Sequence, residues 1–161
     1  MLANLQRLKN LVAPRVAAAC LSTLWNRWTT ARRFQKRGAA GCQCLLGCGP
    51  SADDSIEHYL RCQAAREAAH RALRLGEPSW ERLLLAERGV DDEELTCAAI
   101  LVYAVYNATN LFRHQGGPAP RDEAVQALIQ TCMNAVQGHA PSQSVMDGRW
   151  VAPAARRRRL A

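Results

Sequence analysis

Residues 41–62 read GCQCLLGCGPSADDSIEHYLRC and form the most informative segment of the chain. Four of its side chains, Cys44, Cys48, His58 and Cys62, are candidate metal ligands in the spacing C-x3-C-x9-H-x3-C. Zinc binds three thiolates and one imidazole in a tetrahedron, and this closed set leaves no coordination position for water or substrate. The pattern therefore predicts a structural zinc site, which favours folding and binding over catalysis.

The first half of the motif has the composition of a tight turn. Gly47 lies between the first two cysteine ligands, and Gly49 and Pro50 follow directly. These residues let the chain turn back sharply, so that two thiolates can point at one position. We call residues 44–50 the knuckle. Cys42 is an alternative first ligand in place of Cys44, although the shorter loop is the commoner design.

The second half of the motif has the form of a helix start. Asp54 is predicted to be the N-cap, with Glu57 three residues later as its capping-box partner. His58 and Cys62 are four residues apart, which places them on the same face of the new helix. Loop thiolates and helix ligands are therefore expected to meet at one ion, and metal binding is expected to contribute to folding.

The other cysteines have a different context. The chain contains seven cysteines, an odd number that argues against a complete disulfide framework and for a reducing compartment. Cys20, Cys97 and Cys132 each lie in a segment rich in Ala and Leu, so we expect packed free thiols there. The cysteines of the C-x3-C-x9-H-x3-C motif could likewise be small buried residues and not metal ligands. The helical H-x3-C spacing next to a turn that contains Gly and Pro favours metal ligands.

Three sequence fragments carry a family resemblance: Arg33-Phe-Gln35, the C-x3-C knuckle, and DSIEHYLRC over residues 54–62. Together they resemble the zinc-binding region that follows the polymerase domain in reverse transcriptases of non-LTR (LINE-type) retroelements. The resemblance is limited to about residues 32–62, and it departs from the family at the knuckle, where C-x2-C is commoner. It implies that Cys44, Cys48, His58 and Cys62 are zinc ligands and that the region holds nucleic acid.

Polymerase chemistry is not predicted for this chain. Reverse transcription needs carboxylates that hold two metal ions against the primer end. The candidate, Asp53-Asp54, lacks the preceding aromatic residue and lies inside the zinc loop, where it suits a helix N-terminus. No nucleophile, base and orienting group occur together at a recognisable spacing either. We therefore expect a protein that is not an enzyme.

Charge is distributed unevenly along the chain. Residues 1–52 contain eight Lys or Arg and no acidic residue, whereas residues 53–155 contain nine Arg against fourteen acids. Residues 156–159 are four consecutive arginines, and the formal net charge is +7. Basic segments at both ends favour a polyanionic partner, and the arginine run suits a nuclear import signal, a phosphate contact or an unused tail.

The strongest candidate for a nucleic-acid surface is the segment 27–37, just before the knuckle. Cations alternate there with Trp28 and Phe34, which can stack on unpaired bases while the cations contact RNA or DNA phosphates. The predicted contacts are Arg27, Arg32, Arg33, Lys36 and Arg37. The alternative is a solvated basic helix face whose tryptophans, Trp25 and Trp28, pack inward.

The N-terminal segment bears on localisation. Its basic, acid-free character is shared with mitochondrial presequences, but Ser is scarce and the basic run continues into the zinc motif. The apolar stretch 11–21 is interrupted by Arg15 and is too short to span a bilayer. We expect an intracellular protein, nuclear or cytoplasmic, with no membrane association.

The remainder of the chain has helical periodicity, and no alternating β-branched run of strand length occurs. The predicted fold is all-α, a small helical bundle with one structural zinc knuckle. Helices are expected over residues 15–33, 54–75, 78–87, 91–115 and 121–137, with a loop over 142–150. The predicted units are a basic N-terminal helical arm (1–38), the zinc knuckle and following helix (39–75), a helical bundle (76–138), and a loop with a disordered basic tail (139–161).

Two functions are compatible with these features. The first is a zinc-stabilised nucleic-acid-binding module that resembles the tail of a retroelement reverse transcriptase and has no polymerase activity of its own. The second is a zinc-stapled helical scaffold that binds a protein partner through its apolar helix faces.

Overall fold

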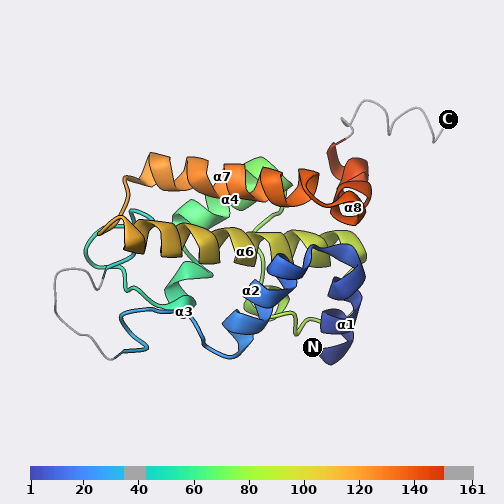
Figure 1. The fold of residues 1–161 in the computed structure, drawn as a ribbon, viewed down its shortest axis with the longest axis horizontal. Helices are drawn as coiled ribbons and strands as arrows, with labels where there is room; N and C mark the ends of the chain where they lie inside the picture. Colours follow the sequence, from blue (N-terminus) through green and yellow to red (C-terminus); the bar gives the residue numbers. More distant parts are fainter. Residues whose placement is uncertain (35–42, 151–161) are drawn as a thin grey trace.

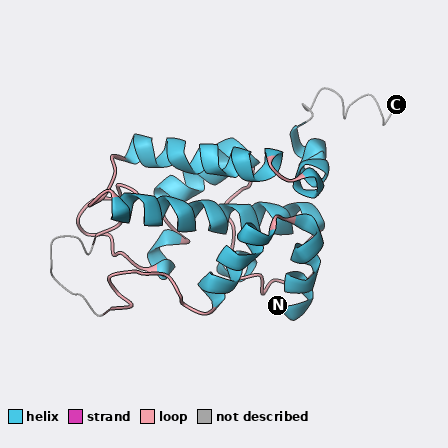
Figure 2. Ribbon diagram, viewed as in Figure 1, coloured by secondary structure: helices cyan, strands magenta, loops and turns pink. Residues whose placement is uncertain are grey.

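The computed structural model describes residues 1–34 and 43–150, and every regular element in these ranges is a helix (Figures 1 and 2). The predicted all-α fold is confirmed. The helices are α1 (Leu2–Leu11), α2 (Pro14–Leu24), α3 (Ile56–Tyr59), α4 (Gln63–Leu73), α5 (Trp80–Leu83), α6 (Asp92–His114), α7 (Arg121–Gln137) and α8 (Ala140–Trp150).

The long helix α6 forms the centre of the bundle. Its N-terminus is capped by the Asp91 carboxylate, which accepts a hydrogen bond of 2.7 Å from the Glu94 backbone N–H. Helices α1, α2 and α7 all pack on α6, and α4 packs on α7; α7 runs alongside α6 in Figure 1. Alanines on the buried face of α4, such as Ala64 and Ala68, allow this close approach.

Helix α6 is apolar enough to resemble a membrane-spanning helix. Among the residues that the structure describes, it is the single helix long and apolar enough to cross a membrane by length and composition. However, 72% of its most apolar 18-residue window is buried inside the protein. A core helix shows the same pattern, and burial in the bundle accounts for these apolar residues.

Three predicted helices are shorter than the sequence pattern indicates. The helix predicted over 15–33 ends at Leu24, where Asn26 follows with a φ of 49°. The helix predicted over 54–75 is divided into α3 and α4, and the one over 78–87 is reduced to α5 before Leu85, whose φ is 56°. A residue in the left-handed conformation terminates a right-handed helix. Asn26 and Leu85 are not glycines, so the sequence does not mark these two helix ends clearly.

The loop predicted over 142–150 is wrong, because α8 occupies this segment. Tertiary contacts hold the helix in place. The Ser142 hydroxyl donates a hydrogen bond of 2.8 Å to the Leu11 carbonyl, and Met146 is fully buried. The Met146 sulfur lies 3.3 Å from the Cys97 thiol on α6. Burial of two side chains therefore outweighs a composition that is typical of loops.

The N-terminal helices belong to the core. Leu8, Val12 and Val16 are buried together with the centre of α6. The Asn4 side-chain amide donates to the carbonyls of Leu85 and Glu87, both at 2.9 Å, which fixes α1 against the loop before α6. The segment predicted as a basic helical arm thus contains two helices whose apolar residues belong to the core.

The three isolated thiols are packed as the sequence predicts. Cys20, Cys97 and Cys132 form no disulfide bond and are buried. Burial raises the pKa of Cys20 and of Cys132 to about 12, so both thiols are neutral at pH 7 and serve as small core residues.

Candidate metal centre and the adjoining basic loop

The four predicted ligands meet at one place. The ligand atoms of Cys44, Cys48, His58 and Cys62 all lie within 4.8 Å of one another. The Cys62 sulfur is 3.9 Å from that of Cys44 and 3.2 Å from that of Cys48. With Zn–S bonds of about 2.3 Å, two sulfurs of a regular tetrahedron are separated by roughly 3.8 Å. The cluster is thus of the size that holds a metal ion, and both separations are far too long for a disulfide.

The imidazole of His58 completes the set. Its Nε2 atom is buried and has no hydrogen-bond partner among the described residues. Buried polar atoms nearly always have a partner, so an unpaired nitrogen beside three thiols suits a metal ligand. The backbone N–H of Leu46 points at the Cys44 sulfur at 3.4 Å, an arrangement that stabilises a thiolate.

Two of the three thiols hold their protons more strongly than an ordinary cysteine. Hydrogen bonding with the Cys44 thiol, together with burial, raises the pKa of Cys62 to about 12. Burial and the neighbouring Cys62 thiol raise the pKa of Cys48 as well. Without a metal these two thiols therefore carry their protons at pH 7. A divalent ion supplies the positive charge that allows buried thiolates to form, and its binding releases protons.

The knuckle is anchored on the start of α7. The backbone N–H of Ala119 donates a hydrogen bond of 3.0 Å to the Leu45 carbonyl. Gly47 has a φ of +75°, and a Cβ at this position would lie 2.7 Å from the Arg121 backbone nitrogen and 2.9 Å from the Ala119 carbonyl oxygen. Both the backbone conformation and the lack of space require glycine.

We expect Gly47→Ala to lower the free energy of unfolding by about 2–4 kcal/mol, the sum of a left-handed backbone penalty and overpacking against backbone. Gly49→Ala is the matched control, because Gly49 also has a positive φ, +93°, but has open space around its Cα. That variant should lose only about 1 kcal/mol. Urea denaturation measures both, and equal losses would show that the contact with α7 does not constrain the knuckle.

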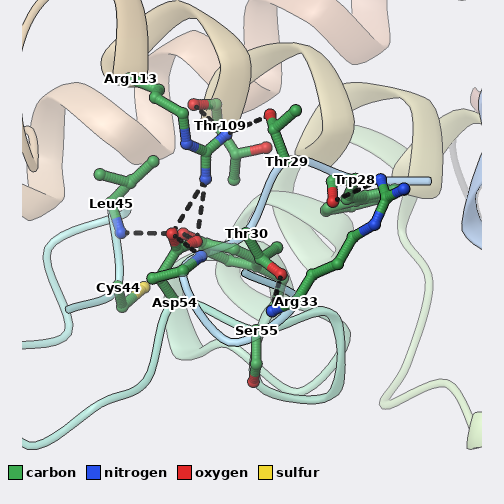
Figure 3. Close-up of polar contacts among 12 residues, drawn as sticks. Trp28, Thr29, Thr30, Arg33, Cys44, Leu45, Asp54, Ser55, Thr109 and Arg113 are labelled. Atoms are coloured by element: carbon green, nitrogen blue, oxygen red, sulfur yellow. Dashed lines mark hydrogen bonds and ion pairs between the residues drawn. The ribbon is translucent and has the colours of Figure 1, made fainter. Parts of the chain in front are cut away.

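Asp54 does not cap α3, and the prediction made for it is wrong. The N-cap is Ser55, whose hydroxyl accepts a hydrogen bond of 3.1 Å from the His58 backbone N–H. Asp54 is instead buried below the knuckle, where its carboxylate pairs with Arg113 of α6 at 2.9 Å (Figure 3). The sequence contained one indication, because Arg113 is the single arginine of α6 and follows its long apolar stretch.

The Asp54 carboxylate joins several segments. It accepts hydrogen bonds of 2.7 Å from the Tyr59 hydroxyl and 2.7 Å from the Ala31 backbone N–H. The Asp54 carbonyl accepts a further hydrogen bond of 3.2 Å from the Arg32 backbone N–H. The Tyr59 hydroxyl in turn accepts from the Leu45 backbone N–H at 3.2 Å. Consecutive hydrogen bonds thus connect the knuckle with the segment that carries Arg32.

Tyr59 is the central side chain of this connection. It directly follows the candidate ligand His58 and is fully buried. Burial and the hydrogen bond to the Asp54 carboxylate raise the pKa of its hydroxyl, so the phenol keeps its proton for that bond. No local pattern in the sequence predicts this role for Tyr59.

The segment 25–34, which we call the basic loop, presents part of the predicted nucleic-acid surface. Arg27, Arg32 and Arg33 are exposed. Two aromatic side chains of the loop are also exposed, Trp25 at 64% and Phe34 at 55%. Lys36 and Arg37 lie outside the described residues, as do Cys42 and the arginine run 156–159.

The two tryptophans of this region have opposite environments. Trp28 is only 2% exposed. Its ring centroid lies 6.0 Å from that of Tyr59 and 5.4 Å from that of Tyr106, and its indole N–H donates to the Thr23 hydroxyl at 3.0 Å. Trp28 therefore anchors the basic loop in the core and cannot stack on a base, whereas Trp25 is free to do so.

No family model, curated protein or solved structure matches this chain.

Proposed function

We propose that this protein is a zinc-stabilised nucleic-acid-binding module, resembling the tail of a retroelement reverse transcriptase and without polymerase activity of its own. The observation that carries the proposal is the basic loop. It exposes Arg27, Arg32 and Arg33 beside Trp25 and Phe34, and its backbone is fixed by hydrogen bonds to Asp54 next to the metal centre.

The donor set supports zinc as the metal. Three sulfurs and one imidazole nitrogen in a closed cluster are the ligands that structural zinc sites use, and thiolates disfavour magnesium and calcium. Cys44 and Cys62 are buried and Cys48 and His58 are partly buried, which suits an ion that stabilises the fold rather than one that meets a substrate.

The basic loop has the two elements that single-stranded nucleic acid requires. Guanidinium groups contact phosphates without regard to sequence. Exposed aromatic rings stack on unpaired bases and contribute about 1–3 kcal/mol per base. Lys36 and Arg37 continue the loop in the sequence and belong to the same proposed surface.

The zinc in this proposal fixes the loop that makes the contacts. Metal binding holds Cys44 and His58, and the adjacent residues Leu45 and Tyr59 are hydrogen-bonded to each other. Tyr59 also holds Asp54, which accepts from the loop backbone at Ala31. An ordered loop loses less conformational entropy when it binds a nucleic acid.

The alternative function, a zinc-stapled protein scaffold, has less support. It requires an apolar helix face that is open to a partner. Among the described residues, the large hydrophobic side chains that are exposed lie at the N-terminus, on the basic loop and on α6: Met1, Leu2, Trp25, Phe34 and Leu111. Two of these five belong to the basic loop, where stacking on bases accounts for them.

We expect the double variant Arg32→Ala, Arg33→Ala to bind a single-stranded RNA 12-mer at least tenfold more weakly at 100 mM salt. Each arginine that neutralises a phosphate contributes about 0.7 to the slope of log K against log salt, so the slope should fall by about 1.4. Fluorescence anisotropy of a labelled oligonucleotide over a salt series measures both quantities.

The matched control for this experiment is Arg71→Ala, Arg88→Ala. It removes the same charge at two exposed positions away from the basic loop; Arg88 precedes the N-terminus of α6, whereas the loop contacts its C-terminal end through Arg113. This control should keep the affinity and salt slope of the unmodified protein. Equal binding by both double variants, or binding without salt dependence, would refute the proposed function.

A further inference from the structure

A pocket of about 260 Å³ opens between the basic loop and α3. Its lining combines two cations, one carboxylate, two neutral polar side chains and one apolar side chain: Arg32, Arg33, Glu57, Asn26, Thr30 and Ile56. The pocket therefore lies on the surface to which we assign nucleic-acid binding, and its walls come from both the loop and the helix that carries His58.

The arginine side of the pocket is held in position. The Arg33 guanidinium donates to the Trp28 carbonyl at 3.3 Å, and its backbone N–H donates to the Thr30 hydroxyl at 3.3 Å (Figure 3). The guanidinium carbon also lies 5.5 Å from the centroid of the exposed Phe34 ring. Because Trp28 and Thr30 are buried, this wall of the pocket is attached to the core.

Glu57 is the unexpected member of the lining. Its carboxylate reaches Arg32 only at 4.0 Å, with both side chains more than half exposed, and accepts no hydrogen bond from a described residue. Such a pair contributes little to stability. A carboxylate also repels phosphates, so a surface that served phosphate binding alone would not include it. The Glu57 carboxylate instead suits a bound molecule that has hydrogen-bond donors next to its phosphates.

We propose that this pocket binds one unpaired guanine of a single-stranded nucleic acid, with the Glu57 carboxylate accepting hydrogen bonds from the guanine N1–H and N2–H groups. Ile56, which is 8% exposed, forms part of the pocket floor, and Arg32 and Arg33 contact the flanking phosphates. This inference rests on the proposed function, since it assigns a base preference to the same surface.

The chemistry of the four bases selects guanine. Its Watson–Crick edge presents two adjacent N–H donors, which a carboxylate accepts in a bidentate manner. Adenine and cytosine each present one amino group next to an acceptor nitrogen, and uracil presents one N–H between two carbonyl oxygens that would face the carboxylate. Unpaired bases expose this edge, and proteins that bind single-stranded RNA read it by hydrogen bonding.

The test compares RNA nonamers of uridine that contain G, A, C or inosine at the centre, measured by fluorescence anisotropy with the full chain. The G oligonucleotide should bind about tenfold more tightly than the A oligonucleotide or the all-U nonamer, as one bidentate pair allows. Inosine lacks the N2 amino group and should be intermediate. The preference should persist in the corresponding DNA oligonucleotides, because the carboxylate contacts the base and not the sugar.

Two variants complete the experiment. Glu57→Gln should abolish the preference for G, so that the G and all-U nonamers bind with similar affinity. Glu81→Gln, the same change at an exposed position of α5, should retain the preference. Equal binding of all nonamers, with binding still weakened by the Arg32 and Arg33 variant, would overturn the guanine pocket alone. Absence of binding to every oligonucleotide would overturn the proposed function as well.

Discussion

Replacing Cys62 with serine should abolish the metal centre and leave a chain without a cooperative unfolding transition. The Cys62 sulfur lies against both other thiols, at 3.9 and 3.2 Å, and a hydroxyl is a poor ligand for zinc. Zinc contributes on the order of 10 kcal/mol in small zinc domains, comparable with the total stability of about 5–15 kcal/mol for a typical domain. Circular dichroism during urea denaturation and the metal content of the purified protein measure the loss.

The control for this variant is Cys132→Ala. Cys132 is also fully buried, but it packs within α7 away from the metal centre. The Cys132→Ala variant should keep one equivalent of zinc and a cooperative unfolding transition. Its free energy of unfolding should fall by about 1 kcal/mol because a buried sulfur is removed. Treatment of the unmodified protein with a chelator should reproduce the Cys62→Ser result. An unchanged urea midpoint after complete metal removal would refute a structural role for the ion.

Replacing Asp54 with asparagine should cost about 3 kcal/mol of stability, because it leaves the Arg113 guanidinium without its carboxylate. Removal of one partner from a buried ion pair costs about 3–5 kcal/mol. The Arg113 side chain is 27% exposed and can be partly hydrated, so the loss should lie at the lower end of these values. Asparagine has nearly the same shape, so the loss reports on charge and hydrogen bonding. The amide also offers one acceptor oxygen, whereas the carboxylate uses one for Tyr59 and the other for Ala31.

The same variant should loosen the basic loop. Hydrogen exchange of the Ala31 and Arg32 backbone amides, which donate to Asp54, should accelerate by more than the change in global stability explains. Asp53→Asn is the matched control, since Asp53 is the exposed neighbour of Asp54. It should change stability by less than about 0.5 kcal/mol. Equal effects of the two substitutions would show that the buried carboxylate does not hold the loop.

The helices that follow from the sequence are those with local signals at both ends. Helix α7 begins at Arg121 and ends at Gln137 as its periodicity and Gly138 indicate. Helix α6 begins after the Asp91 cap. The breaks at Asn26 and Leu85 carry weaker signals, because neither residue is the glycine that usually marks a left-handed position at the end of a helix. Helix α8 forms against its composition because Ser142 and Met146 are buried by α1 and α6.

The helical class and the group of four candidate ligands follow from the sequence alone, because helix periodicity, capping and ligand spacing are local properties. The burial of Trp28, the need for glycine at position 47 and the role of Asp54 become visible only in the folded chain. Each of these depends on a partner distant in the chain: Tyr106 for Trp28, the start of α7 for Gly47, and Arg113 for Asp54. Local sequence patterns do not reveal such pairs, because the two partners are far apart in the chain and come into contact only in the folded structure.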